Sequence, residues 1–226
     1  MEYSLGRLYV EDKRDADYPM RSLLGPTAAE SLRTYRYWYP SGWWGDQKAT
    51  SQCVAFSWMH WLEDGPVTHF ARHENRYPVM DPRVVYMEAQ LVDMWPGTNY
   101  AGTSVRAGAK VLRKYGFVSH FYWATSLAEV VEAILKLGPV VVGTSWYSNM
   151  FYPDQENRVH ATGSARGGHA YVLNGVNARQ GKLRIKNSWG RSWGNNGHAW
   201  ISFEDFAKLL DQQGDACIAT EVPDAS

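Results

Sequence analysis

The hydrophobic pattern of this chain changes at Gly138-Pro139, and this change constrains the fold more than any other feature. Before it, apolar residues recur at helical spacing; after it, they form short β-branched or aromatic runs separated by Gly and Asn. Helices followed by strands predict an α+β fold with two lobes. The predicted helices cover 51–62, 82–94, 103–115 and 127–137, and the predicted strands cover 140–142, 170–173, 183–185 and 199–201.

The same pattern divides the chain into three parts. Residues 1–40 are polar and interrupted by prolines, so we expect an irregular arm that packs on the fold. Residues 41–122 are expected to form a mainly helical lobe, and residues 123–226 a mainly β lobe. The segment 145–168 has no clear periodicity, which predicts a surface loop near the functional site.

Composition and charge exclude several classes of protein. The 226 residues include 23 Lys and Arg and 23 Asp and Glu, so the net charge of zero provides no basic field for nucleic acid. No apolar run approaches the ~18 residues of a membrane span, and residues 1–14 lack the apolar segment of a secretory signal. We therefore expect no nucleic-acid partner, no membrane attachment and a cytoplasmic location, with a virion or an injected location as alternatives. The oligomeric state is not predicted.

The cysteines exclude two further classes. Cys53 and Cys217 are the only two in the chain, too few for a disulfide-stapled scaffold or for a zinc site built on paired cysteines. His69 and His73 are four residues apart and could share one face of a helix, but no third metal ligand accompanies them. We therefore predict no metal and no cofactor.

Cys53 lies near the start of a predicted helix, where the helix dipole favours the thiolate, which is the reactive form of cysteine. It is either a buried apolar residue or a nucleophile. A nucleophilic cysteine needs a base and a group that orients the base. His169 stands at the entry of a predicted strand, and the side-chain oxygen of Asn187 could hold its imidazole toward the sulfur.

Three motifs in this order resemble the active-site segments of the papain family of cysteine peptidases. Asp46-Gln47 precedes Cys53-Val54-Ala55-Phe56-Ser57, much as a D/N-Q pair precedes C-W-A-F-S in that family. Gly168-His169-Ala170 resembles the family's histidine motif. The run Lys186-Asn187-Ser188-Trp189-Gly190, followed by Trp193-Gly194, resembles K-N-S-W-G-x-x-W-G. The segment 100–104 falls where the family has its glycine-rich substrate-binding segment, so the resemblance covers most of the chain.

The resemblance implies a papain-like two-lobed fold with a cleft between the lobes, and a cysteine endopeptidase that takes peptide or protein substrates. Cys53 and His169 would form a thiolate–imidazolium pair, and Cys53 would form a thioester acyl-enzyme. Asn187 would orient His169, and the side-chain amide of Gln47 would stabilise the oxyanion together with the backbone N–H of Cys53. The same resemblance implies substrate-binding residues, which are Gly102, Thr103, Gly168, Trp189 and Trp193.

The sequence also departs from the family pattern. Val54 follows the nucleophile where the family usually has Trp, and Gly168 replaces the acidic or Asn residue that commonly precedes the histidine. Thr50 stands where many members have a half-cystine, which fits a reducing compartment or a bacterial, archaeal or viral branch. The arm is shorter than the usual folded prosegment, so control by such a prosegment is not expected.

Two alternative functions stay open at this point. The same triad supports acyl transfer to an acceptor other than water, as in a peptide ligase, a cyclase or an amidase. A papain-like fold also suits a non-catalytic binding protein. The aromatic segment 35–44 is either a partner contact or part of the core, and we expect it to belong to the core.

Overall fold

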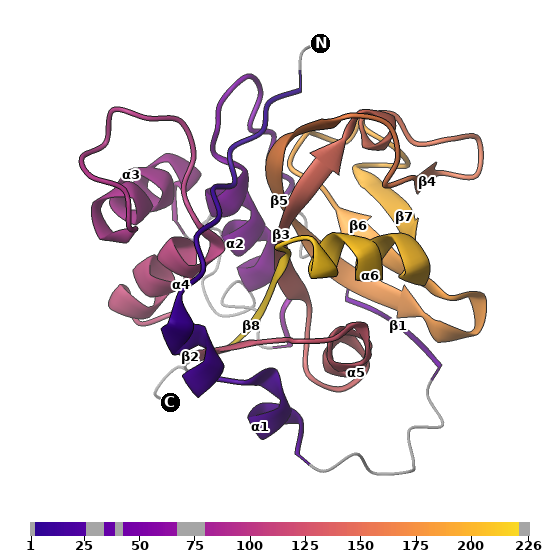
Figure 1. Ribbon diagram of the computed structural model, residues 1–226, viewed down its shortest axis with the longest axis horizontal. Coiled ribbons are helices and arrows are strands. Elements are labelled where there is room, and N and C mark those ends of the chain that lie inside the picture. Colours follow the sequence, from indigo (N-terminus) through magenta and orange to yellow (C-terminus); the bar gives the residue numbers. More distant parts are fainter. Residues whose placement is uncertain (1–2, 26–33, 39–42, 67–79, 222–226) are drawn as a thin grey trace.

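A computed structural model of the chain describes residues 3–25, 34–38, 43–66 and 80–221. The fold is the predicted α+β architecture, with α2, α3 and α4 gathered on one side and most strands, with α5 and α6, on the other (Figure 1). The helices are η1 (Lys13–Asp17), α1 (Met20–Leu24), α2 (Cys53–Asp64), α3 (Pro82–Val92), α4 (Val105–Lys114), α5 (Leu127–Lys136), η2 (Ser148–Met150), η3 (Ala178–Gln180) and α6 (Phe203–Asp211). The strands are β1 (Tyr35–Tyr37), β2 (Val118–Trp123), β3 (Val140–Tyr147), β4 (Arg158–Val159), β5 (Ala165–Asn177), β6 (Lys182–Lys186), β7 (His198–Ser202) and β8 (Asp215–Glu221).

The long strand β5 organises the sheet. The strand order is β2-β8-β3-β5-β6-β7-β4, with β1 paired to β5 outside this path. Along β5, the pairing with β3 extends from Ala165 to Leu173, whereas the pairing with β6 begins only at Val172. The first half of β5 therefore has an edge that β6 leaves uncovered.

Alternate residues of β3 and β5 enter two hydrophobic cores. Val141 and Val172 pack in the cluster that contains α2, α3 and α4, while Val140 and Leu173 pack in the cluster that contains α5 and α6. This is the period-two alternation of a strand with both faces covered. All twelve residues of α2 are buried. A helix enclosed in this way provides a rigid platform for the residue at its start.

Local sequence explains where the helices begin. The side chain of Asp81 caps α3 by accepting from the N–H of Arg83, and Pro82 fills the first helical position, as the sequence predicts. The hydroxyls of Ser104, Ser126 and Ser202 cap α4, α5 and α6 in the same way.

Several expectations need correction. The segment 145–168 is not a loop throughout, because β3 continues to Tyr147, β5 begins at Ala165, and β4 lies between them. The arm is not wholly irregular, since it contains η1, α1 and β1.

His69 and His73 lie outside the described residues. Within the described part of the chain, no helix combines the length and the apolar character that a membrane crossing requires.

One buried ion pair links α2 to the sheet. Lys186 Nζ of β6 lies 2.7 Å from Asp64 Oδ1 at the end of α2, and both side chains are fully buried. We expect Lys186→Met to lower the free energy of unfolding by about 3–5 kcal/mol, because it leaves a buried carboxylate without its cation. Urea denaturation measures this loss.

The matched control is the exposed pair of Arg158 and Glu156, whose nitrogen and oxygen are also 2.7 Å apart. Removing that pair with Arg158→Gln should cost at most about 1 kcal/mol. Equal losses in the two variants would show that the Lys186–Asp64 pair does not join α2 to the sheet as described.

Candidate active site

Cys53 is the first residue of α2 and is fully buried. Its Sγ accepts a hydrogen bond from the backbone N–H of Ala170 on β5, at 3.4 Å. Ala170 directly follows His169 in the chain, so the packing of α2 on β5 brings the sulfur to the strand that carries the imidazole.

The hydrogen bonds of Asn187 define the tautomer of His169. Asn187 Oδ1 lies 2.8 Å from His169 Nε2 and also accepts from the backbone N–H of Ser188 at 2.8 Å. Because a backbone N–H can only donate, this side-chain atom is the amide oxygen, and Nε2 of the neutral imidazole carries the proton. Nδ1 then holds a lone pair, and it is buried with no hydrogen-bond partner among the described residues. Nδ1 is therefore the ring nitrogen that can accept a proton.

Tryptophan rings enclose this imidazole. Trp189 stacks on His169 with centroids 4.6 Å apart, and Trp146 packs edge-on at 4.8 Å. Trp193 is set further back, packed edge-on against Trp189 at 5.8 Å and donating to the carbonyl of Phe151. These rings exclude water from the bond between His169 and Asn187, which strengthens that bond.

Gln47 is held next to the same turn. Its Oε1 accepts from the hydroxyl of Ser188 at 2.6 Å, which directs the Nε2 group the other way. Nε2 donates to the carbonyl of Thr50 at 2.6 Å and to the carbonyl of Ser4 at 3.1 Å. The resemblance assigns Gln47 Nε2 as a donor to the oxyanion, and in this structure it already contacts two peptide carbonyl oxygens.

The carbonyl of Ser4 belongs to the N-terminal arm, whose residues 3–8 cover the site. Thr103 N–H donates to the carbonyl of Gly6 at 3.0 Å, and Leu8 N–H donates to the carbonyl of Thr103 at 2.9 Å. On the opposite side, the N–H groups of Gly6 and Arg7 both reach the carbonyl of Gly168, at 3.0 and 2.9 Å. In Figure 1 the arm is the indigo segment that runs from N between the helices and the strands. Main-chain groups at the expected substrate-binding positions thus hold the protein's own chain.

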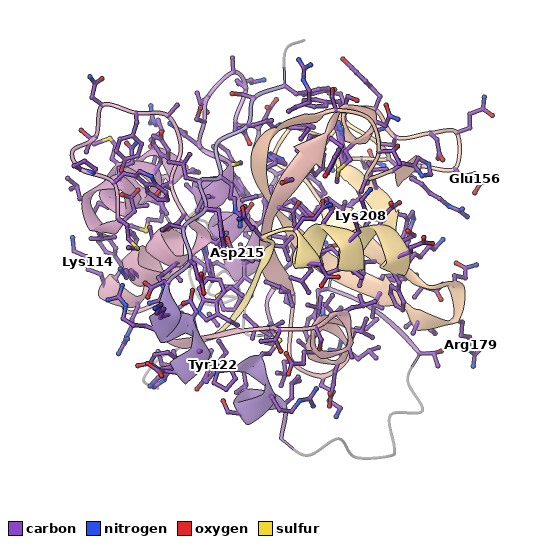
Figure 2. The ribbon with its side chains drawn as sticks, in the orientation of Figure 1. Lys114, Tyr122, Glu156, Arg179, Lys208 and Asp215 are labelled. Atoms are coloured by element: carbon purple, nitrogen blue, oxygen red, sulfur yellow. The ribbon has the colours of Figure 1, made fainter. Side chains whose placement is uncertain are left out.

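Three residues of the arm explain why the arm fits over the site. Gly6 passes so close to the turn before α2 that an added Cβ would lie 2.2 Å from the carbonyl oxygen of Ser51. Arg7 forms a buried ion pair with Asp215, at 2.7 Å; Asp215 is labelled near the centre of Figure 2. Tyr3 stacks on Trp189 with centroids 4.5 Å apart.

The arm was not identified as part of the site from sequence. Gly6 carried a usable signal, because a lone glycine in a polar stretch can mark close backbone approach. Arg7 and Asp215 are separated by more than 200 residues, and no local pattern connects them. Ser188, which holds both Gln47 and Asn187, lies inside the asparagine motif, but the motif alone indicates no role for it.

Burial sets the charge state of the covered site. It raises the pKa of the Cys53 thiol to about 12, with the hydrogen bond from Ala170 acting in the opposite direction. It lowers the pKa of His169 to about 4, against the hydrogen bond to Asn187. Both groups are therefore neutral at pH 7, and this conformation does not favour the expected thiolate–imidazolium pair. The cause is desolvation, because charged forms need solvent or partners that the covered site lacks.

The remaining sequence expectations concern cysteine and metal chemistry. Cys53 and Cys217 are both free and buried. Cys217 lies on β8 opposite Val141 and packs in the core with α2, so it behaves as an apolar residue. Across the described ranges, no group of three or more His, Cys, Asp or Glu side chains could hold a metal ion.

Comparison with known proteins places this chain in a family. A sequence model described as papain family cysteine protease matches residues 88–214, more than half of the chain, including His169 and Asn187. The chain belongs to the papain family of cysteine proteases. Cys53 and Gln47 precede the matched residues, and it is the structure that brings them close to the segments of His169 and Asn187.

Solved structures of papain-family proteases share the fold. Xylellain, a cysteine protease from Xylella fastidiosa, is 18% identical with a TM-score of 0.76, and the match covers 97% of each chain. Digestive procathepsin L2 from Tenebrio molitor is 18% identical with a TM-score of 0.66, over 96% of this chain and 78% of that one. Bromelain from Ananas comosus, solved with the E64 inhibitor, is 14% identical with a TM-score of 0.59, over 84% and 99%. These likenesses establish a papain-like fold.

The pKa of Cys53 predicts how this papain-family site reacts with an alkylating agent. Only the thiolate reacts, and its fraction rises about tenfold per pH unit below the pKa. Because burial raises that pKa to about 12, the alkylation rate at Cys53 should rise about 100-fold between pH 7 and pH 9. Iodoacetamide labelling with peptide mapping measures the rate, and a pH-independent rate would show that the thiol is ionised in the covered site.

Proposed function

We propose that this papain-family chain is a cysteine peptidase that hydrolyses peptide bonds, with Cys53 as nucleophile and His169 as general base and acid. One observation carries the proposal. Asn187 fixes His169 Nε2 as the protonated nitrogen, and Nδ1 is left buried without a partner, on the strand whose next N–H contacts Cys53 Sγ. Buried side-chain nitrogens usually have a hydrogen-bond partner, so an unsatisfied one needs an explanation, and a role as proton acceptor provides it for His169.

The proposed reaction proceeds in two stages. Cys53 Sγ attacks the carbonyl carbon of the peptide bond, and the thiol proton passes to His169 Nδ1. The oxyanion accepts from the backbone N–H of Cys53 and from Gln47 Nε2. His169 then protonates the leaving amine, and the acyl group stays on sulfur as a thioester. In the second stage, His169 takes a proton from water, which attacks the thioester and frees Cys53.

The contacts of the arm support a peptide substrate. Main-chain groups of Thr103 and Gly168 bind extended backbone without using its side chains, which is strand addition. Gln47 Nε2 and Trp189 Nε1 both donate to the Ser4 carbonyl, each at 3.1 Å, so this end of the site accepts peptide oxygens. An incoming substrate needs these same groups, and the arm must therefore leave before catalysis.

The oxyanion role predicts a selective defect in Gln47→Ala. Losing one preorganised donor lowers kcat by about 10²–10³, while alkylation of Cys53 changes little because alkylation forms no oxyanion. Cys53→Ala should abolish peptide cleavage in a folded protein. Comparable losses of turnover and alkylation in Gln47→Ala would contradict the role.

Product analysis in the presence of an added amine separates hydrolysis from acyl transfer. Hydrolysis releases the acyl part of the substrate as a free acid, whereas acyl transfer joins it to the amine.

Displacing the arm should activate the enzyme. Gly6→Val places a side chain against the backbone of Ser51, so the arm cannot seat, and we expect at least a tenfold rise in peptide turnover and in Cys53 alkylation at pH 7. This factor corresponds to about 1.4 kcal/mol of lost arm binding.

Lys13→Ala is the matched control, because Lys13 is exposed on the same arm. It should leave both rates unchanged. A folded Gly6→Val protein with the turnover of the parent would show that the arm does not restrain the site.

A further inference from the structure

The side chain of Arg7 leaves the arm and enters the interior of the protein. Although it is long and charged, only 4% of it is exposed. In the main chain, Arg7 lies opposite Thr103, which bonds to the arm residues on either side of Arg7 through its own N–H and C=O. The space that the side chain fills, called here the Arg7 recess, is formed by Val105, Gly143, Gly168 and Asp215. The recess therefore opens at the position where extended chain pairs with Thr103.

Two glycines make room for the stem of this side chain. A Cβ added at Gly143 of β3 would lie 2.7 Å from Arg7 Nε and 2.9 Å from Arg7 Cγ. A Cβ added at Gly168 of β5 would lie 3.2 Å from Arg7 Cδ. Val105 of α4 packs against the same spot, since its Cγ2 would lie 2.9 Å from the Cβ added at Gly143. The recess thus holds a long side chain because these strands carry glycine where other residues would fill it.

Asp215 of β8 places a carboxylate at the end of the recess, opposite Gly143 in the sheet. Its Oδ2 accepts from Arg7 Nε at 3.1 Å and from Arg7 Nη2 at 2.7 Å. Arg7 Nη2 also donates to the carbonyl of Gln213 at 2.6 Å. Over the described ranges, Arg7 alone provides side-chain hydrogen bonds to the carboxylate of Asp215. The end of the recess thus presents a carboxylate and a peptide carbonyl, both of which suit a guanidinium.

The departure of the arm removes the cation from this carboxylate. The side chain of Asp215 is only 15% exposed. Burial raises the pKa of Asp215 to about 6, with Arg7 acting in the opposite direction, so the group is mainly charged at pH 7. A buried charge without its partner is strongly unfavourable. A peptide that brings a cation into the recess therefore gains a contact that a neutral peptide cannot make.

We propose that the peptidase selects substrates with a basic side chain, arginine above all, and that Asp215 determines this preference. The inference rests on the proposed function and names its substrate class. Arginine is favoured over lysine because its guanidinium reaches both Asp215 and the carbonyl of Gln213. Ser4, whose carbonyl accepts from Gln47 Nε2, precedes Arg7 by three residues. The basic residue is therefore expected within about three residues of the cleaved bond.

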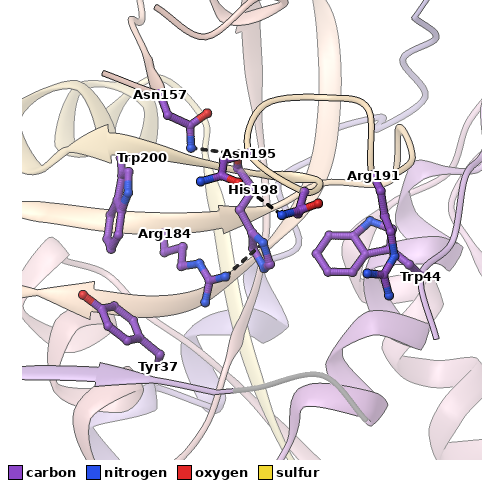
Figure 3. Close-up of a pocket in the computed structure, with 9 residues that line it drawn as sticks. Tyr37, Trp44, Asn157, Arg184, Arg191, Asn195, His198 and Trp200 are labelled. Atoms are coloured by element: carbon purple, nitrogen blue, oxygen red, sulfur yellow. Dashed lines mark hydrogen bonds between the residues drawn. The ribbon is translucent and has the colours of Figure 1, made fainter. Parts of the chain in front are cut away.

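A second pocket, on the β side of the molecule, lacks this chemistry (Figure 3). Arg184, Arg191 and His198 line it, and no carboxylate stands among its described lining residues. Arg184 Nη2 lies 2.9 Å from His198 Nδ1 (Figure 3). This pocket offers no anionic group to a basic side chain, so the preference for a cation belongs to the Arg7 recess.

Cleavage of a positional peptide library by the Gly6→Val protein, in which the arm is displaced, tests the preference. We expect arginine at one fixed position to raise kcat/KM at least tenfold over leucine, because it adds charge-assisted hydrogen bonds. Asp215→Asn, added to the Gly6→Val protein, should bring this ratio close to one. A merely structural defect would lower both rates and leave the ratio unchanged.

Asp211→Asn in the same protein is the matched control, because Asp211 is exposed at the end of α6. It should leave the ratio unchanged. Cleavage without a basic preference, or a preference that survives Asp215→Asn, would overturn the inference while the proposed function stands.

Peptide binding tests the recess without catalysis. The Cys53→Ala, Gly6→Val protein is titrated with a fluorescently labelled peptide of residues 3–10, and with the same peptide carrying Arg7→Leu, and anisotropy is measured. The arginine peptide should bind at least tenfold more tightly, and Asp215→Asn should remove the difference. Equal affinities, or no binding of either peptide, would overturn the inference. Selective binding by a chain that cleaves no peptide would contradict the proposed function and leave the role of Asp215 in place.

Discussion

The contact between the start of α2 and the first half of β5 is the constraint on which the site depends. Since β6 joins β5 only from Val172, the preceding edge of β5 keeps main-chain groups available. Alternate residues of a strand present their N–H and C=O to the same edge. Ala170 N–H binds the sulfur of Cys53 there, and Gly168 C=O binds the arm. A strand that its neighbour pairs along only half of its length thus binds both Cys53 and the arm that covers it.

Ser188 joins the two parts of the site that come from different ends of the chain. Its N–H fixes the oxygen of Asn187, its hydroxyl fixes Gln47, and its carbonyl accepts from the Gln47 N–H at 2.8 Å. The groups proposed to stabilise the imidazole and the oxyanion are therefore oriented by one residue. Buried networks of this kind are rigid when every member is satisfied, and here the imidazole nitrogen proposed to accept the proton is left unsatisfied.

Much of the fold could be predicted from sequence, because helical spacing and caps are local signals. Asp81-Pro82 marked the start of α3, and the helices α2 to α5 fall where apolar spacing placed them. The strands β2 and β8 were not predicted, since their pairing joins residues about 100 positions apart. The motifs located Cys53, His169 and Asn187, but not the arm over them, because the ion pair of Arg7 with Asp215 depends on tertiary structure alone.

The close passage of Gly6 over Ser51 has a consequence for how substrates are selected. An occupant that belongs to the same chain competes at an effective concentration that dilution cannot lower, commonly in the millimolar range for short connections. A free peptide binds only the fraction of molecules that are open, so its apparent affinity is its intrinsic affinity multiplied by that fraction. The Michaelis constant of the proposed peptidase would thus report the opening equilibrium of residues 3–8 as much as the fit of any substrate side chain.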